Sequence, residues 1–302
     1  MTRIATAVLV LTLAGAPAMA DTVLLPDLSV HLMAAHYAPV DTNFRWVGWI
    51  GAGAGLVEVG GVTAYFTADV ETIIGNARRT FDANQANYHL EAGLRRRLGE
   101  QHEAAIVFHH VSRHVVDRVK VEAVDWNILG ARVTGRRPGR VPLSYTAGLG
   151  HTTLASLVGY RWEATGRLDA AIFTGEKAEA YVAGDARFVT VERSDAFPRG
   201  NFLDRSAEGG VRWRRGGRCL ETFAAWQRRN DVFIQRPGAW SRALFGFRIL
   251  FNAGGYRANY APPHAHTRSP PSRSRRSDAG AQRWRAGAAP LSGGAQKSGA
   301  RC

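Results

Sequence analysis

The chain has 302 residues, is 45% hydrophobic and carries a formal net charge of +14. No run of 18 apolar residues follows the N-terminus, which excludes a helical membrane protein, and two cysteines far apart in sequence exclude a disulfide scaffold. Residues 257–302 hold nine Arg or Lys and one acid, and so supply +8 of the charge. Because the excess sits in one terminal segment and no nucleic-acid-binding motif is present, the sequence predicts no nucleic-acid partner.

The first twenty residues have the three parts of a secretory signal peptide. They combine a positively charged start, an apolar core at residues 4–13, and small residues (Ala18 and Ala20) at positions −3 and −1 of a cleavage site. We therefore expect residues 1–20 to be removed. Residues 21–42 are expected to form an N-terminal periplasmic segment outside the folded domain.

Residues 43–256 alternate with a period of two, which is typical of strands. In residues 62–71 one face carries Val, Ala, Phe, Ala and Val, and the other carries Thr, Tyr, Thr, Asp and Glu. The pattern predicts about twelve strands, from thirteen candidate runs at 43–51, 54–60, 62–73, 86–97, 103–114, 122–133, 142–151, 154–164, 167–176, 178–192, 207–215, 218–230 and 241–251. The second run is the one expected to be a false split, with Gly60-Gly61 a kink inside one strand.

Two short turns are expected between these runs. Arg215-Gly216-Gly217-Arg218 has the composition of a tight hairpin, and Leu98-Gly99-Glu100-Gln101 joins the runs that precede and follow it. The sequence therefore predicts consecutive strands that pair as antiparallel hairpins.

Two architectures fit many alternating strands, a periplasmic β-sandwich and a transmembrane barrel. The barrel is favoured because the runs are about as long as a tilted span requires and because their polar faces carry charges suited to a wet interior. These charges are Asp69, Glu71, Glu91, Arg95, Arg161 and Glu163. Aromatic residues near strand ends predict an interfacial girdle made of Trp46, Trp49, Tyr160, Trp162, Trp213, Trp226 and Trp240. The sequence thus predicts an all-β protein of the cell outer membrane, an up-and-down antiparallel barrel over residues 43–256.

The run Leu244–Phe251 (LFGFRILF) resembles the closing strand of Gram-negative outer-membrane barrels, which ends on an aromatic residue. That resemblance implies barrel-insertion machinery as a partner, although 51 residues follow Phe251 here. Residues 108–117 (FHHVSRHVVD) resemble a segment of an uncharacterised outer-membrane family. Residues 257–302 predict a disordered basic tail. Two interpretations of it stay open, a native tail that contacts lipopolysaccharide and a C-terminus replaced by a frameshift.

One polar cluster is expected on the hairpin formed by residues 86–97 and 103–114. A two-residue or a four-residue turn near Gly99 would bring together polar side chains from both strands. The cluster is expected to contain Asn87, His89, Glu91, His110, Ser112 and His114.

A serine, a histidine base and an orienting carboxylate are the parts of an acyl hydrolase. The His-x-Ser pair is also similar to the lipid A 3-O-deacylases, a resemblance that implies His110 as the base and Ser112 as the nucleophile, with Glu91 as the orienting acid. That family has Asn after the serine, where this chain has Arg113, and its barrels are smaller.

Other functions for the same residues stay open. His89, His110 and His114 with Glu91 would also suit a metal ion, and hydrogen-bonded polar side chains routinely line barrel interiors. No phosphate loop, nucleotide fingerprint or metalloprotease helix is present, so no cofactor and no metal are predicted. The role predicted from the sequence is an outer-membrane barrel of unassigned function, with a lipid-directed acyl hydrolase and a passive channel as alternatives and outer-membrane lipid or lipopolysaccharide as partner.

Overall fold

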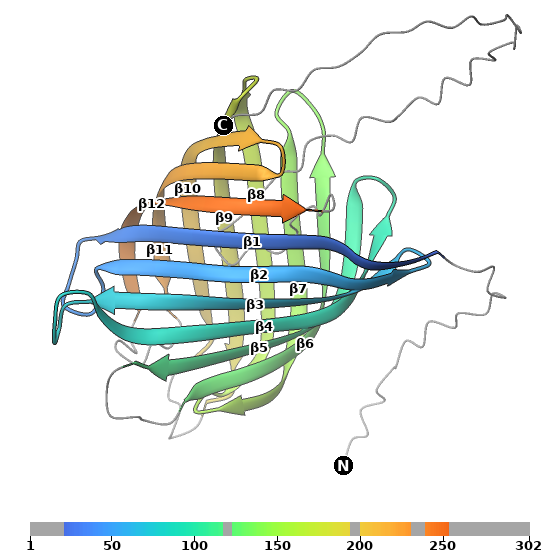
Figure 1. Ribbon diagram of the computed structural model, residues 1–302. Coiled ribbons are helices and arrows are strands. Elements are labelled where there is room, and N and C mark those ends of the chain that lie inside the picture. The colour runs from blue at the N-terminus through green and yellow to red at the C-terminus, as the bar shows by residue number, and fades with distance from the viewer. Residues whose placement is uncertain (1–20, 117–122, 194–199, 231–238, 254–302) are drawn as a thin grey trace, which may run out of the picture. The chain divides into compact units, whose positions relative to one another are not determined.

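The described part of the chain is a closed antiparallel barrel of twelve strands (Figure 1). The computed structural model describes residues 21–116, 123–193, 200–230 and 239–253, so the predicted signal peptide and basic tail lie outside the described residues. No helix in these ranges is long and apolar enough to cross a membrane. The strands are β1 (Thr22–Ala38), β2 (Trp46–Val59), β3 (Val62–Gly75), β4 (Asp82–Leu98), β5 (His102–Val115), β6 (Val124–Arg137), β7 (Leu143–Ser156), β8 (Tyr160–Thr174), β9 (Ala178–Val191), β10 (Phe202–Arg215), β11 (Arg218–Arg229) and β12 (Trp240–Ala253).

Each strand pairs with its neighbours in the chain, and β1 closes the barrel by pairing with β12 as well as with β2. The expectation that residues 21–42 lie outside the folded domain is therefore wrong. Thr22–Ala38 is a barrel strand whose apolar outer face, which includes Leu28, Val30 and Leu32, is exposed. The number of strands was predicted correctly only because this missed strand offset a surplus of candidate runs.

The surplus came from two places. Candidate runs 43–51 and 54–60 are one strand, β2, which continues through the glycine-rich residues 51–55. Candidate run 154–164 covers the end of β7 and the start of β8, and run 167–176 covers the rest of β8. Gly60 and Gly61 are a turn between β2 and β3 and not the predicted kink, and their positive φ angles of 57° and 78° suit a tight two-residue hairpin. The predicted hairpin at Gly216-Gly217 is confirmed, since Arg215 pairs directly with Arg218.

The connections fall into two classes at the two ends of the barrel. The turns after β2, β4, β6, β8 and β10 have two to five residues, and the ends of β1 and β12 lie on that side. Most connections at the other end are longer, up to ten residues after β9 and after β11. In barrels of this class short turns face the periplasm and longer loops face outward, which orients the chain in the membrane.

Strand alternation divides the side chains between an apolar exterior and a polar lumen. Leu90, Ile106, Leu129, Phe188 and Phe245 are among many large apolar residues exposed on the outside. A continuous outer apolar surface on a closed barrel is the surface that lipid covers, and the protein is accordingly an outer-membrane β-barrel. The charges predicted for a wet interior are there at Asp69, Glu71, Glu91, Arg95 and Glu163, whereas Arg161 is exposed.

The predicted aromatic girdle is only partly correct. Trp162, Trp213 and Trp226 are 41–49% exposed, as an outer girdle requires. Trp49, Tyr160 and Trp240 are buried instead. They belong to two apolar clusters inside the barrel, one with Tyr37 and Phe44 around Trp240, the other with Trp126 and Phe202 around Tyr160.

A network of ion pairs fills the lumen between β8 and β12. The guanidinium of Arg212 donates to Glu221 at 2.7 Å and to Asp169 at 2.9 Å. That of Arg248 donates to Glu208 at 2.6 Å and to Glu221 at 3.1 Å. Because every charge here has opposite charges within hydrogen-bond distance, the network offsets the cost of burying these groups together.

We expect Arg248→Met to destabilise the barrel by about 3–5 kcal/mol, because the change leaves buried carboxylates at Glu208 and Glu221 without that cation. The measurement is urea unfolding of the protein in lipid vesicles, followed by tryptophan fluorescence. The matched control is Arg161→Met, which removes an exposed ion pair with Glu192 and should cost less than about 1 kcal/mol. Equal costs for the two variants would contradict a stabilising role of the lumenal network.

Candidate functional site

The structure divides the predicted polar cluster between the two faces of the barrel wall. The turn after β4 has three residues, because Leu98 pairs with His102, and this places Leu90 opposite His110 and Tyr88 opposite Ser112. The predicted registers, built on turns of two or four residues, are wrong by one residue. A shift of one residue moves every side chain of one strand to the other face.

Asn87, His89 and Glu91 point into the lumen, where all three are buried. Asn87 donates to Glu71 at 2.6 Å. Glu91 accepts hydrogen bonds from Tyr65 at 2.8 Å and from Arg132 at 2.9 Å. Glu91 is therefore held on the lumenal side and does not orient a histidine beside Ser112.

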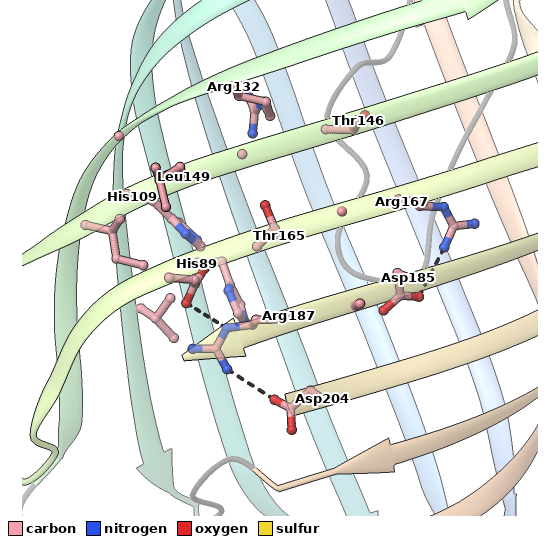
Figure 2. Close-up of a pocket in the computed structure, with 18 of the residues that line it drawn as sticks. His89, His109, Arg132, Thr146, Leu149, Thr165, Arg167, Asp185, Arg187 and Asp204 are labelled. Atoms are coloured by element: carbon pink, nitrogen blue, oxygen red, sulfur yellow. Dashed lines mark hydrogen bonds and ion pairs between the residues drawn. The ribbon is translucent and has the colours of Figure 1, made fainter. Parts of the chain in front are cut away.

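His89 and Glu91 border a cavity of about 220 Å³, which is drawn in Figure 2. The inner face of β7 carries only small side chains here, including Thr146, Gly148 and Gly150, which leaves room against that wall. His89 and His109 line the opposite side with stacked rings, 5.7 Å between centroids, and neither Nε2 atom has a hydrogen-bond partner among the described residues. Arg187 enters the same space and donates to Glu163 at 2.6 Å and to Asp204 at 3.2 Å.

His110, Ser112 and His114 share the outward face of β5 with the exposed residues Ile106 and Phe108. On that face His114 is exposed and His110 half-buried, whereas Ser112 is only 8% exposed. The metal site considered from the sequence is therefore wrong, because His89 and Glu91 lie on the other side of the wall. Within the described ranges no three His, Cys, Asp or Glu side chains are grouped to hold a metal ion.

Asn127 on β6 completes the outward group and was missed in the sequence. It lies directly opposite His110, and its Oδ1 is 2.6 Å from His110 Nδ1. The alternation along β6 could have identified it, because Asn127 is a polar residue on the same face as the apolar residues Leu129, Ala131 and Val133. A polar side chain in a lipid-facing position costs free energy, so its presence there calls for a functional explanation.

Ser112 is hydrogen-bonded to His114, the other histidine on the outward face of β5. Its Oγ lies 2.6 Å from His114 Nε2, and the His114 ring packs edge-on against Tyr88 at 5.5 Å. Ser112 thus has one imidazole two residues before it and another two residues after it on the same face. We define His110, Ser112, His114 and Asn127 as the outer-face site.

The outer-face site lies near the long-loop end of the barrel. Ten residues separate Ser112 from His102 at the short-turn end of β5. At about 3.3 Å per residue and a tilt of about 40°, this spans about 25 Å, the height of the apolar band of such barrels. Ser112 is therefore level with the polar boundary of the outer leaflet.

Comparisons with known proteins bear on the fold. No protein-family model and no curated protein matches the chain. Similar solved structures include the outer membrane phospholipase (OMPLA) dimer with bound calcium from Salmonella typhi, with 9% identity, a TM-score of 0.47, and coverage of 80% of this chain and 94% of that one. LpxR from Salmonella typhimurium has 9% identity, a TM-score of 0.43 and coverage of 74% and 99%. The translocator domain of autotransporter NalP from Neisseria meningitidis has 12% identity, a TM-score of 0.39 and coverage of 75% and 87%.

The orientation of β5 can be tested with a fluorophore. After replacement of Cys219 and Cys302 by serine, a bimane label is attached to Phe108→Cys or to His109→Cys in vesicles that contain brominated lipid. We expect strong quenching at position 108, which faces lipid with His110 and Ser112, and weak quenching at position 109, which faces the lumen. The reverse pattern would contradict the register and, with it, the outer-face site.

Proposed function

We propose that this outer-membrane barrel is a serine acyl hydrolase that acts on lipids of the outer leaflet. The observation that carries the proposal is the hydrogen bond of 2.6 Å between His110 and Asn127, two residues from an outward-facing serine. Ser112 is the nucleophile, His110 is the general base, and Asn127 takes the orienting role that the sequence suggested for Glu91.

The chemistry of the pair supports this assignment of roles. The side-chain oxygen of Asn127 can only accept a hydrogen bond, so His110 Nδ1 carries the proton that it receives. The other nitrogen, Nε2, then has a free lone pair and can accept a proton from a serine hydroxyl. Asn127 therefore fixes both the ring orientation and the tautomer that a base needs.

The position of Ser112 between two histidines also supports the proposal. Side chains two residues apart on one face of a strand lie about 6.5–7 Å apart at Cα, so an imidazole on either side can reach the hydroxyl. In the structure the hydroxyl is buried and contacts His114, so the reaction requires a change of the Ser112 rotamer towards His110. We assign the base to His110 because its ring has an orienting partner.

The surroundings suit a lipid ester. Exposed apolar side chains extend from the outer-face site towards the short-turn end of the barrel, namely Leu90 opposite His110 and the cross-strand pair of Phe108 and Leu129. An acyl chain can lie along them while its ester group, at the polar boundary, meets Ser112. Nothing has to leave the membrane for the reaction to begin.

The reaction then follows ordinary acyl transfer. Ser112 Oγ attacks the ester carbonyl carbon, and its proton passes to His110 Nε2. The carbon–oxygen bond to the leaving alcohol breaks as the alcohol takes that proton. Water, activated by the same histidine, hydrolyses the acyl-serine and releases a fatty acid.

A passive channel, the other function considered from the sequence, has less support. Ion pairs and hydrogen bonds join strands across the lumen. Arg229 on β11 donates to Glu71 on β3 at 2.9 Å, and Arg132 on β6 donates to Tyr65 on β3 at 3.1 Å. These contacts occupy the path that a diffusing solute would take.

We expect Ser112→Ala and His110→Ala each to lower the release of fatty acid from outer-membrane lipid vesicles by about a thousandfold or more, because each removes a reacting group. Asn127→Ala should cause a smaller loss, since the base remains but is no longer oriented. Mass spectrometry of the released acid gives the rate. The matched control is His109→Phe, which changes the neighbouring lumenal histidine and should leave the rate unchanged.

Two outcomes would contradict these assignments. Release at the wild-type rate by Ser112→Ala would exclude Ser112 as the nucleophile. A larger loss in His114→Ala than in His110→Ala would transfer the role of base to His114. Heat-modifiable migration on gels shows that each variant is folded.

A further inference from the structure

A second feature of the outer surface lies five strands away from the outer-face site around the barrel. Arg205 on β10 and Arg228 on β11 are directly opposite each other in the register, and both are exposed. Two cations in directly opposed positions repel each other. We define them as the arginine pair.

The arginine pair has no acid partner on its own face among the described residues. The three acids of β10 and β11 point into the lumen and are engaged there. Asp204 accepts from Arg187 at 3.2 Å, Glu208 from Arg248 at 2.6 Å, and Glu221 from Arg212 at 2.7 Å. The charge on this part of the exterior is therefore positive and is not neutralised by the described part of the protein.

The height of the arginine pair indicates what neutralises it. Arg228 lies ten residues from Arg218 at the short-turn end of β11, the same separation that places Ser112 at the outer polar boundary. Trp226, one outward position below, is 42% exposed and lies 5.6 Å from the guanidinium of Arg205. Tryptophan at this level is typical of the membrane interface, so the two guanidinium groups meet lipid head groups.

We propose that the arginine pair binds the phosphate of an outer-leaflet lipid. Two guanidinium groups can each donate two parallel hydrogen bonds to phosphate oxygens, and the bound anion removes the repulsion between the two cations. The apolar part of the lipid lies along Trp226, which is exposed one outward position below Arg228 on the side of the short-turn end. The chemistry is shared by the phosphate monoesters of lipid A and by the phosphodiester of an anionic phospholipid.

The same hairpin provides a matched control. Arg215 and Arg218 are also directly opposite each other and exposed, but they flank the Gly216-Gly217 turn at the other end of β10 and β11. The control pair has the same charge, the same residue type and the same pairing, and differs in height.

The test uses the folded barrel in detergent and native mass spectrometry to count bound lipid. The probes are lipid A with both phosphates, lipid A without phosphate, and phosphatidylglycerol. We expect wild-type protein to bind a phosphorylated probe, Arg205→Gln/Arg228→Gln to bind it at least tenfold more weakly, and Arg215→Gln/Arg218→Gln to bind it like wild type. Arg205→Lys/Arg228→Lys keeps the charge but loses the paired donors, and should bind with intermediate affinity.

The probes identify the source of the phosphate. A tenfold loss confined to lipid A assigns the site to lipopolysaccharide, and a loss for phosphatidylglycerol assigns it to phospholipid. Equal binding of lipid A with and without phosphate would overturn the proposal. An equal loss in the Arg215/Arg218 control would do so too, because any positive charge would then serve. None of these measurements depends on acyl release. A failure of phosphate binding at the arginine pair can therefore be distinguished from a failure of the proposed hydrolase.

Discussion

The side chains of this protein are sorted by one constraint, the strict alternation of residues along strands whose hydrogen bonds close into a ring. In such a wall every residue faces either lipid or lumen, and the register between two strands decides which. The hairpin of β4 and β5 shows how much depends on this, because its three-residue turn places Glu91 on the inner face of the wall and Ser112 on the outer face. The same alternation places the two proposed sites on the exterior and the charged groups in the interior.

The lumen shows what the alternation requires of the inner face. Both apolar clusters lie at the long-loop end, and the wall supplies few apolar side chains to the rest of the lumen, so the interior there is stabilised by paired charges. Arg212, Arg248 and the carboxylates around them take the place of a hydrophobic core. Such pairs are weak sources of stability compared with apolar packing, but a broken pair is costly, and this restricts the alternative ways in which the strands could pack.

Much of the fold could be predicted from alternation alone, and the failures have physical reasons. Residues 62–71 were assigned to the correct strand and the correct faces because their two faces differ sharply. The strand β1 was missed because its inner face carries alanine and methionine as well as polar residues, and because its register shifts between Leu24 and Asp27. The error therefore concerns a segment in which the two faces of the strand differ little in polarity.

The site was harder to predict than the fold for a different reason. Ser112, His110 and His114 were identified correctly as sharing a face, because residues two apart on one strand need no pairing information. Their partners on other strands depend on the register: a difference of one residue in the turn after β4 removes Glu91 from the site, and the pairing of β5 with β6 supplies Asn127. Cross-strand partners therefore need the register, which composition alone does not supply.

Closure by the first and last strands has a consequence for how the protein is made. β1 pairs with β12 from Leu28–Ala253 to Ala38–Ala243, so the ring cannot be completed until β12 has been synthesised. Until then two strand edges expose unpaired amide and carbonyl groups, which hydrocarbon does not tolerate and which invite pairing with other chains. Closure is therefore the last strand pairing that can form, and it joins the first described strand to the last.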